Sequence, residues 1–180
     1  FCLTQKQREA LKEGEYLVVI DSKIFSGQLN YGELVLPGEI DKEVLISTYI
    51  CHPSMANNEL SGPTVTTYLA KWLKELPNLY YTYRIIFIPE TIGSITYLSN
   101  NFNHLKNKVV AGFNVSCVGD DRSHSYLPSR NGNTISDKVA KHVLKWIAPN
   151  YKSYSWLDRG SDERQYCAPG IDLPVASILR

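Results

Sequence analysis

Short apolar runs alternate with helix-like segments along this chain, and few folds accommodate that pattern. Most of the runs are apolar throughout, which is typical of strands buried on both faces of a parallel sheet. They predict strands over Tyr16–Ile20, Leu34–Leu36, Glu43–Cys51, Tyr83–Ile88, Val109–Val115 and Asp172–Leu179. Helix signals predict helices over residues 4–13, 64–76, 93–101 and 134–147. We therefore predict an α/β fold, a three-layer sandwich with a mostly parallel central sheet, in one domain over residues 1–180.

Two of the predicted helices carry apolar side chains at helical spacing. The first set comprises Val65, Leu69, Trp72, Leu73 and Leu76. The second set comprises Ile135, Val139, Val143 and Ile147. This spacing gathers apolar side chains on one side of a helix, so both segments are predicted to be amphipathic.

Composition excludes several classes of protein. The 180 residues are 43% hydrophobic with a net charge of +1, which fits one domain with a substantial core and gives no basic surface for nucleic acid or membrane. The chain starts without methionine and ends directly after an apolar run, so we expect it to be part of a longer protein. Its four cysteines, Cys2, Cys51, Cys117 and Cys167, form no CxxC pair, and we expect a reducing, cytoplasmic setting.

Polar residues gather where the predicted strands end. His52 closes the strand over 43–51, and Asn58 and Glu59 follow in the next loop. The other such residues are Glu90, Asp120, Asp121 and, before the last strand, Asp162. Parallel strands of an open sheet place their ligand sites outside their carboxyl ends, so these side chains are predicted to share one rim. A histidine with several carboxylates suits a zinc hydrolase, in which an unligated carboxylate takes a proton from the attacking water.

Each of these residues also has a purely structural interpretation. His52 could be a hydrogen-bonded core group, and Glu90 could cap the helix that follows it. Asp120 and Asp121 follow a glycine, as turn residues often do. Asp162 could be a helix N-cap or the partner of Arg159 or Arg164. The functional interpretation depends on the four strand ends taken together.

Four motifs carry a resemblance to a known family. They are His52-x-Ser54, the run from Ala56 to Gly62, the run Ile88-Pro89-Glu90-Thr91-Ile92-Gly93-Ser94, and Gly160-Ser161-Asp162-Glu163 with the segment up to Pro174. Together they resemble the co-catalytic di-zinc aminopeptidase and carboxypeptidase superfamily. The chain is most similar to the aminopeptidase-like proteins of uncertain function found among bacterial polysaccharide-biosynthesis genes. This resemblance implies a zinc-exopeptidase-like (phosphorylase/hydrolase-like) fold.

The resemblance also implies roles for individual residues. His52 matches the first zinc-binding histidine, and Glu90 matches the general base that activates water. The last metal-binding histidine of the family would lie beyond Arg180.

Other positions depart from the family pattern. Asn58 stands at the position of the aspartate that bridges both metals, and Glu59 stands where an asparagine usually follows. Thr91 and Ser116 replace two further carboxylate ligands. Amides and hydroxyls supply no charge to offset that of a dication, so these changes argue against a complete two-metal site. A single zinc ion could still be held by His52, by Glu59 or Asp120, and by a histidine outside this chain.

Two functions follow from these expectations. The first is a metal-dependent hydrolase with Glu90 as base, acting on an amide bond of a peptide or sugar-linked substrate. The alternative is a non-catalytic binding or assembly module of the same fold. A serine or cysteine hydrolase is disfavoured because the chain has no Gly-x-Ser-x-Gly motif and because neighbouring strand residues, here Cys51 and His52, should point to opposite faces.

Overall fold

A seven-stranded sheet forms the centre of the structure, a computed structural model that describes residues 3–52, 54–158 and 160–180. Cys2, Pro53 of the first motif and Arg159 therefore lie outside the described residues. Within them the strand order is β1-β3-β2-β4-β7-β5-β6. The strands are β1 (Gly32–Leu36), β2 (Ile40–Tyr49), β3 (Tyr81–Ile88), β4 (Val109–Val115), β5 (Ser125–Leu127), β6 (Lys152–Ser153) and β7 (Val175–Leu179).

The four central strands are parallel to one another. β2 pairs with β3 and β4, and β4 pairs with β7, all in parallel. β1 and β5 join on either side as antiparallel strands, and the short β6 runs parallel to β5. The predicted mostly parallel sheet is therefore confirmed.

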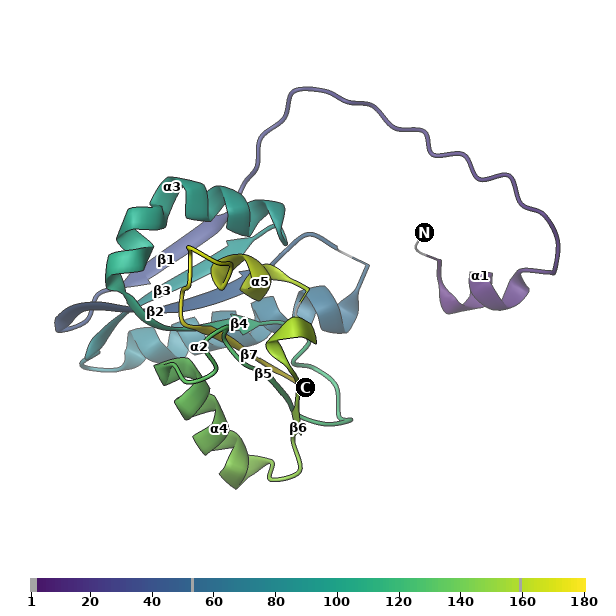
Figure 1. Cartoon of the computed structure of the whole chain (residues 1–180). Helices are drawn as coiled ribbons and strands as arrows, with labels where there is room; N and C mark the ends of the chain where they lie inside the picture. The colour runs from purple at the N-terminus through teal and green to yellow at the C-terminus, as the bar shows by residue number, and fades with distance from the viewer. Residues whose placement is uncertain (1–2, 53, 159) are drawn as a thin grey trace.

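Helices cover both faces of this sheet (Figure 1). Figure 1 shows α3 (Ile92–Lys108) and α5 (Asp162–Tyr166) on one face and α2 (Gly62–Glu75) and α4 (Ile135–Ile147) on the other. Three shorter elements complete the described chain: α1 (Gln5–Ala10), the π-helical turn η1 (Ala56–Ser61) and the 3₁₀ turn η2 (Trp156–Asp158). The arrangement is the predicted three-layer α/β sandwich.

Side chains of the central strands alternate between two buried layers. Leu45 of β2 packs with α3 and α5 in a core that also contains Leu98, Leu105, Tyr166 and Val175. Ile46, the next residue, faces α2 and packs with Ile85, Ala70 and Leu73. A third cluster lies beneath α4 and contains Tyr126, Ala140, Leu144 and Ala176. Burial on both faces explains why these strands are apolar throughout.

Helices α2 and α4 do not bury the whole of their apolar faces. The residues that α4 buries are Ser136, Asp137, Ala140 and Leu144, whereas Val139, Val143 and Ile147 remain 40–65% exposed. On α2, Thr66, Ala70 and Leu73 are buried while Trp72 is 56% exposed. The two exposed faces border an apolar hollow of about 340 Å³ that includes Leu69, Trp72, Ile135 and Val139.

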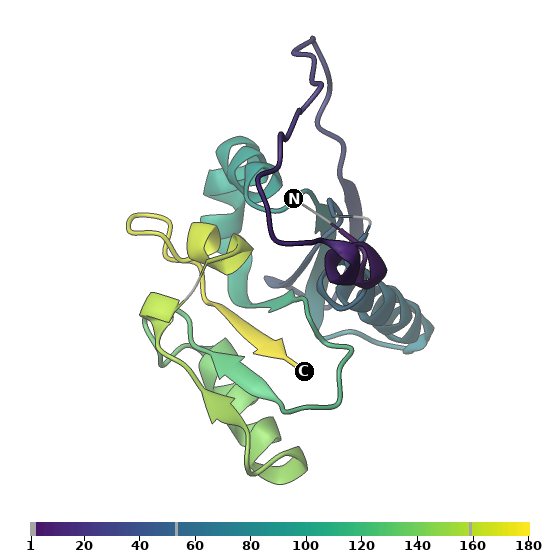
Figure 2. The ribbon, with the colours of Figure 1, turned by 90° about the vertical axis from the view of Figure 1, so that its right-hand side faces the viewer.

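The N-terminal segment departs most from the sequence prediction. Tyr16–Ile20 forms no strand, and Leu17 and Val19 are 93% and 77% exposed. Figures 1 and 2 show residues 11–31 running away from the body of the molecule, so the apolar run finds no strand edge within the described chain to pair with. The predicted strand is therefore wrong for this structure, because an apolar run becomes a strand only where a partner supplies hydrogen bonds.

Several predicted boundaries shift by a few residues. The helix over 93–101 extends as α3 to Lys108, and the helix over 4–13 ends at Ala10. The last strand begins at Val175, since Asp172 has a left-handed φ of 51°. β2 ends at Tyr49, so Cys51 and His52 lie beyond it. Among the helices of the described residues, none has both the length and the apolarity needed to cross a membrane.

The topology creates a rim at the carboxyl ends of β2, β3 and β4. The chain crosses from β2 to β3 through α2 and from β3 to β4 through α3, on opposite faces of the sheet. β2 lies between β3 and β4, so loops leave this part of the sheet in opposite directions. Open α/β sheets place ligand sites at such a switch point.

Candidate metal centre

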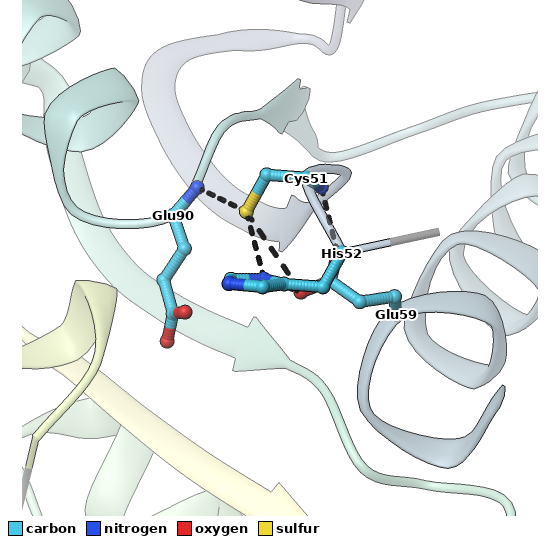
Figure 3. Close-up of side chains that lie close together, drawn as sticks. All are labelled: Cys51, His52, Glu59 and Glu90. Atoms are coloured by element: carbon cyan, nitrogen blue, oxygen red, sulfur yellow. Dashed lines mark hydrogen bonds and ion pairs between the residues drawn. The ribbon is translucent and has the colours of Figure 1, made fainter. Parts of the chain in front are cut away.

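Cys51, His52 and Glu59 meet just beyond the end of β2 (Figure 3). The Glu59 carboxylate accepts a hydrogen bond from the backbone N–H of Cys51 at 2.7 Å. Its Oε1 lies 2.6 Å from Nδ1 of His52. The Cys51 thiol lies 3.2 Å from the same Nδ1. Glu59 is 3% exposed, whereas the imidazole of His52 is half-exposed.

The turn η1 brings Glu59 back over the strand ends. Its π-helical winding is a rare geometry that often occurs at functional sites. Gly62, where α2 begins, lies against the sheet so closely that a Cβ would come within 2.3 Å of the Val115 carbonyl oxygen and 2.5 Å of Thr48 Oγ1. Glycine at this position therefore allows the turn to sit directly above β2 and β4.

Glu90 enters the same cluster from the end of β3. Its backbone N–H donates to Cys51 Sγ at 3.1 Å, and its Oε1 accepts a hydrogen bond from Ser161 Oγ at 2.5 Å. Potential ligand atoms of Cys51, His52, Glu59 and Glu90 all lie within 4.8 Å of one another. The residues that the sequence predicts as ligand and base are thus neighbours.

The electrostatics of Glu59 suit a ligand. Burial raises the pKa of Glu59, but hydrogen bonds from the backbone of Cys51 and His52 and from the His52 side chain outweigh it and hold the pKa below its ordinary value. Glu59 therefore stays ionised in a buried position. An ionised carboxylate beside an imidazole is a suitable pair of donors for a dication.

The donor set can be tested against the spacing that one zinc ion requires. Thiolate, imidazole and carboxylate are all zinc ligands, and two of them on one tetrahedral ion lie about 3.3–3.8 Å apart. Cys51 Sγ lies 3.2 Å from His52 Nδ1 and 3.8 Å from Glu59 Oε1. The 2.6 Å contact between His52 and Glu59 is a hydrogen bond that would have to lengthen. The cluster therefore fits one ion after a small adjustment of side chains.

The structure corrects one prediction about Cys51. Its side chain does not point away from that of His52, because both residues follow the end of β2 and strand alternation no longer applies. Burial raises the pKa of the Cys51 thiol, and the carboxylates of Glu59 and Glu90 raise it further. The thiol is therefore a weak nucleophile here, which argues against cysteine hydrolase chemistry.

The Asn58 side chain contacts Tyr49 and Cys117 rather than the His52–Glu59 pair. Its amide nitrogen donates to Tyr49 Oη at 3.1 Å and to Cys117 Sγ at 3.6 Å. Burial raises the pKa of the Tyr49 phenol, so its hydroxyl stays neutral. Hydrogen bonds with Ser116 and Ser161 lower this pKa and the charge of Glu90 raises it, but burial has the largest effect. The Asn58 amide and the Ser116 hydroxyl, both neutral, thus occupy positions where the resemblance expects carboxylates.

Asp162 lies next to Glu90 but does not join the cluster. As the first residue of α5, with Ser161 as N-cap, it accepts hydrogen bonds from Thr91 N at 2.6 Å and Ser94 Oγ at 3.0 Å. Thr91 has a left-handed φ of 62°, and the bond from Asp162 stabilises this strained conformation directly after Glu90. Burial raises the pKa of Asp162 to about 7, and its Oδ2 has no hydrogen-bond partner among the described residues.

Asp120 and Asp121 lie apart from the cluster. Asp120 forms an ion pair with Arg122 at 2.5 Å and accepts a hydrogen bond from Asn57. Asp121 is exposed and pairs with Arg180. The predicted rim therefore divides into a cluster around His52 and a second polar region beyond β4.

Sequence reasoning assigned no metal-site role to Cys51 and none to Tyr49 and Ser161. Cys51 adjoins the predicted ligand His52, and that adjacency was the available signal. Tyr49 and Ser161 come together only in three dimensions. Beside the cluster, a mostly apolar hollow of about 320 Å³ is bordered by Ile50, Cys51, His52, Glu59, Leu60 and Pro63.

The fold and the strand-end cluster define an aminopeptidase-like α/β protein, in agreement with the resemblance seen in the sequence. Residues 16–180 match the family model described as a domain of unknown function, DUF4910, and the chain belongs to that family.

Individual proteins support this assignment. A Clostridium acetobutylicum protein described as a candidate polysaccharide biosynthesis protein with an aminopeptidase-like domain is 44% identical over 180 residues. The match covers 100% of this chain, which spans 41% of that relative. The crystal structure of a candidate peptidase from Clostridium acetobutylicum matches with a TM-score of 0.85 at 44% identity, covering 99% of this chain and 42% of the other. A peptidase M28 precursor from Shewanella amazonensis shares the fold, with a TM-score of 0.58 at 17% identity over 81% of this chain and 34% of its own.

Proposed function

We propose that this chain carries the active site of a zinc-dependent, aminopeptidase-like hydrolase that cleaves an amide bond of a peptide or sugar-linked substrate. One observation carries the proposal: the potential ligand atoms of Cys51, His52, Glu59 and Glu90 lie within 4.8 Å of one another at the carboxyl ends of neighbouring strands. The peptidase-like descriptions of the Clostridium acetobutylicum proteins support a hydrolytic role. The comparisons offer no support for the non-catalytic alternative.

Each residue of the cluster has a role in this proposal. His52, Glu59 and Cys51 would hold one zinc ion, which would supply Lewis-acid polarisation of the scissile carbonyl and of water. Glu90 takes a proton from water as the water oxygen bonds to the carbonyl carbon. It then gives the proton to the amine nitrogen as the C–N bond breaks. The hydrogen bond from Ser161 orients the Glu90 carboxylate for both transfers.

The substitution Glu90→Gln tests the role of the base. The amide keeps the shape of Glu90 but accepts no proton, so amide hydrolysis should fall roughly 100- to 10,000-fold while zinc content stays unchanged. Zinc is measured by elemental analysis of protein purified without chelator, and hydrolysis is followed with aminoacyl-amide substrates. Glu75→Gln, at an exposed residue at the end of α2, is the matched control.

Three outcomes would contradict parts of this proposal. Unchanged turnover in Glu90→Gln would exclude Glu90 as the base. Loss of zinc from Glu90→Gln would place Glu90 among the ligands instead. Native protein without stoichiometric zinc would overturn metal dependence.

A further inference from the structure

A third hollow, of about 310 Å³, is lined by residues that follow β4, by β6 and Tyr154, and by Asn57 of the turn η1. Two of its lining residues lie close in the structure to the candidate metal centre: Asn57 belongs to the turn that supplies Glu59, and Cys117 follows β4. Cys117 Sγ accepts a hydrogen bond from Asn58, whose amide also donates to Tyr49. Side-chain contacts from Cys117 through Asn58 to Tyr49 therefore connect this hollow with the end of β2, where the cluster lies.

The hollow carries an excess of positive charge. Arg122, Lys152 and Arg180 line it, whereas Asp120 is the one acidic residue among the described residues of its lining. Asp120 is paired with Arg122 at 2.5 Å, and Arg180 pairs with Asp121, which is not among the lining residues. Lys152 has no ion-pair partner in the part of the chain that the structure describes. An unpaired ammonium group at the wall of a hollow attracts anions.

Neutral donors accompany this charge. Ser123, Ser125 and Tyr154 also line the hollow, and their hydroxyls make no hydrogen bond to any described residue. Hydroxyl groups donate readily to carboxylate and phosphate oxygens. An ammonium group together with three hydroxyls that have no hydrogen-bond partner among the described residues is a donor set suited to an oxyanion.

The wall that presents these groups is fixed by backbone hydrogen bonds. Lys152 N donates to His124 O at 2.9 Å, and Tyr154 N donates to Tyr126 O at 3.0 Å, so the lining strand is anchored to β5. On the opposite wall, Gly119 N donates to Asn57 Oδ1 at 2.8 Å. The Asn57 side chain also donates to Asp120, which joins the turn η1 to the loop after β4.

We propose that this cationic hollow binds a carboxylate or phosphate group of the substrate on which the neighbouring centre acts. The substrate assignment rests on the proposed function, whereas anion binding itself does not. The other hollow, beside His52 and Glu59, is mostly apolar. The substrate class is therefore an amide with one anionic end and one apolar end.

Anion binding is tested directly with inorganic phosphate and acetate, titrated at constant ionic strength against chloride. The readout is the melting temperature of the purified protein. We expect a saturable rise, and Lys152→Met should raise the half-saturating concentration about tenfold or more. Lys152→Arg should retain binding because it keeps the charge. Lys74→Met, which removes an exposed charge from α2, should bind like the native protein.

The anion that saturates identifies the substrate group: phosphate alone indicates a phosphoryl group, and both anions indicate that a carboxylate suffices. The inference would be overturned if phosphate and acetate caused no saturable rise in melting temperature beyond that with chloride. It would also be overturned if Lys152→Met and Lys74→Met lost anion affinity equally. Phosphate binding by an inactive, zinc-free protein would support the hollow and contradict the proposed function. If the protein is a zinc-dependent hydrolase and its preference for anionic over neutral amides is unchanged by Lys152→Met, the inference is overturned but the proposed function stands.

Discussion

Asp137 shows how a single buried carboxylate can stabilise this fold. It accepts hydrogen bonds from Ser129 N at 2.8 Å, Ser129 Oγ at 2.5 Å, Tyr126 Oη at 2.6 Å and Thr134 N at 2.8 Å. Burial raises its pKa, but these bonds outweigh burial and lower the pKa to about 2. Asp137 thus joins the start of α4 to the loop after β5.

Asp137 should make the protein sensitive to acid. Its folded pKa lies below the ordinary value, so its contribution is complete above pH ~4 and is lost as pH falls towards 2. The difference corresponds to roughly 2 kcal/mol of unfolding free energy. The unfolding free energy, measured with urea at pH 3 and pH 7, should differ less between the two pH values in Asp137→Asn than in the native protein. Asp21→Asn, in the exposed N-terminal segment, should leave the difference unchanged; an equal pH dependence in Asp137→Asn would refute the assignment.

A substitution at a second single residue, Asn58, tests the metal site. The substitution Asn58→Asp would supply a carboxylate where the di-zinc superfamily is expected to have its bridging aspartate. We expect tighter zinc binding, measured by competition with a chromogenic chelator. Asn57→Asp, one residue earlier in the same turn, is the matched control because its side chain is directed to Asp120 and Gly119. No gain in affinity for Asn58→Asp, or an equal gain for Asn57→Asp, would contradict the alignment.

The sequence predicted part of this site for a clear reason. His52 and Glu90 each follow an apolar strand, and parallel strands bring such residues to one rim. The detailed contacts were not predictable, because they depend on where β2 ends. Once the strand stops at Tyr49, Cys51 turns towards His52, and the π-helical turn directs Glu59 rather than Asn58 to the histidine.

At the scale of elements, helix α4 shows that an apolar repeat in the sequence does not always mark the buried face of a helix. Its apolar repeat was predicted correctly as helical, yet its buried face contains Ser136, Asp137, Ala140 and Leu144. Of the apolar side chains that remain exposed, Ile135 and Val139 line the hollow shared with α2. Sequence periodicity identifies a helix but cannot say which side meets the sheet when both sides carry apolar groups.

Substitutions on α4 should reflect this orientation. Leu144 is fully buried, so Leu144→Ala should lower the unfolding free energy by about 2–5 kcal/mol. Val143 is 40% exposed, and Val143→Ala should cost less than about 1 kcal/mol. Urea denaturation of both variants measures the difference. Equal losses would mean that α4 packs with a different face.

For the whole molecule, the apolar pattern predicted the central strands and the sandwich but not the sheet edges. β2, β3, β4 and β7 are buried between helices, and burial on two faces leaves an apolar signature. β5 and β6 have three and two residues, too few to show any period. They are held by hydrogen bonds to neighbours that are distant in the chain.

The position of β7 constrains the order in which the molecule can be assembled during synthesis. β7 comes last along the described chain yet lies between β4 and β5 in the sheet. Strands β1, β3, β2 and β4 can pair once Val115 has been made, because their partners all precede it. β5 and β6 have no place on the sheet until Val175–Leu179 has left the ribosome, because β5 pairs with β7 and β6 pairs with β5. Among the described elements, those that form the cationic hollow can therefore be completed only after the strands that carry His52, Glu59 and Glu90 have paired.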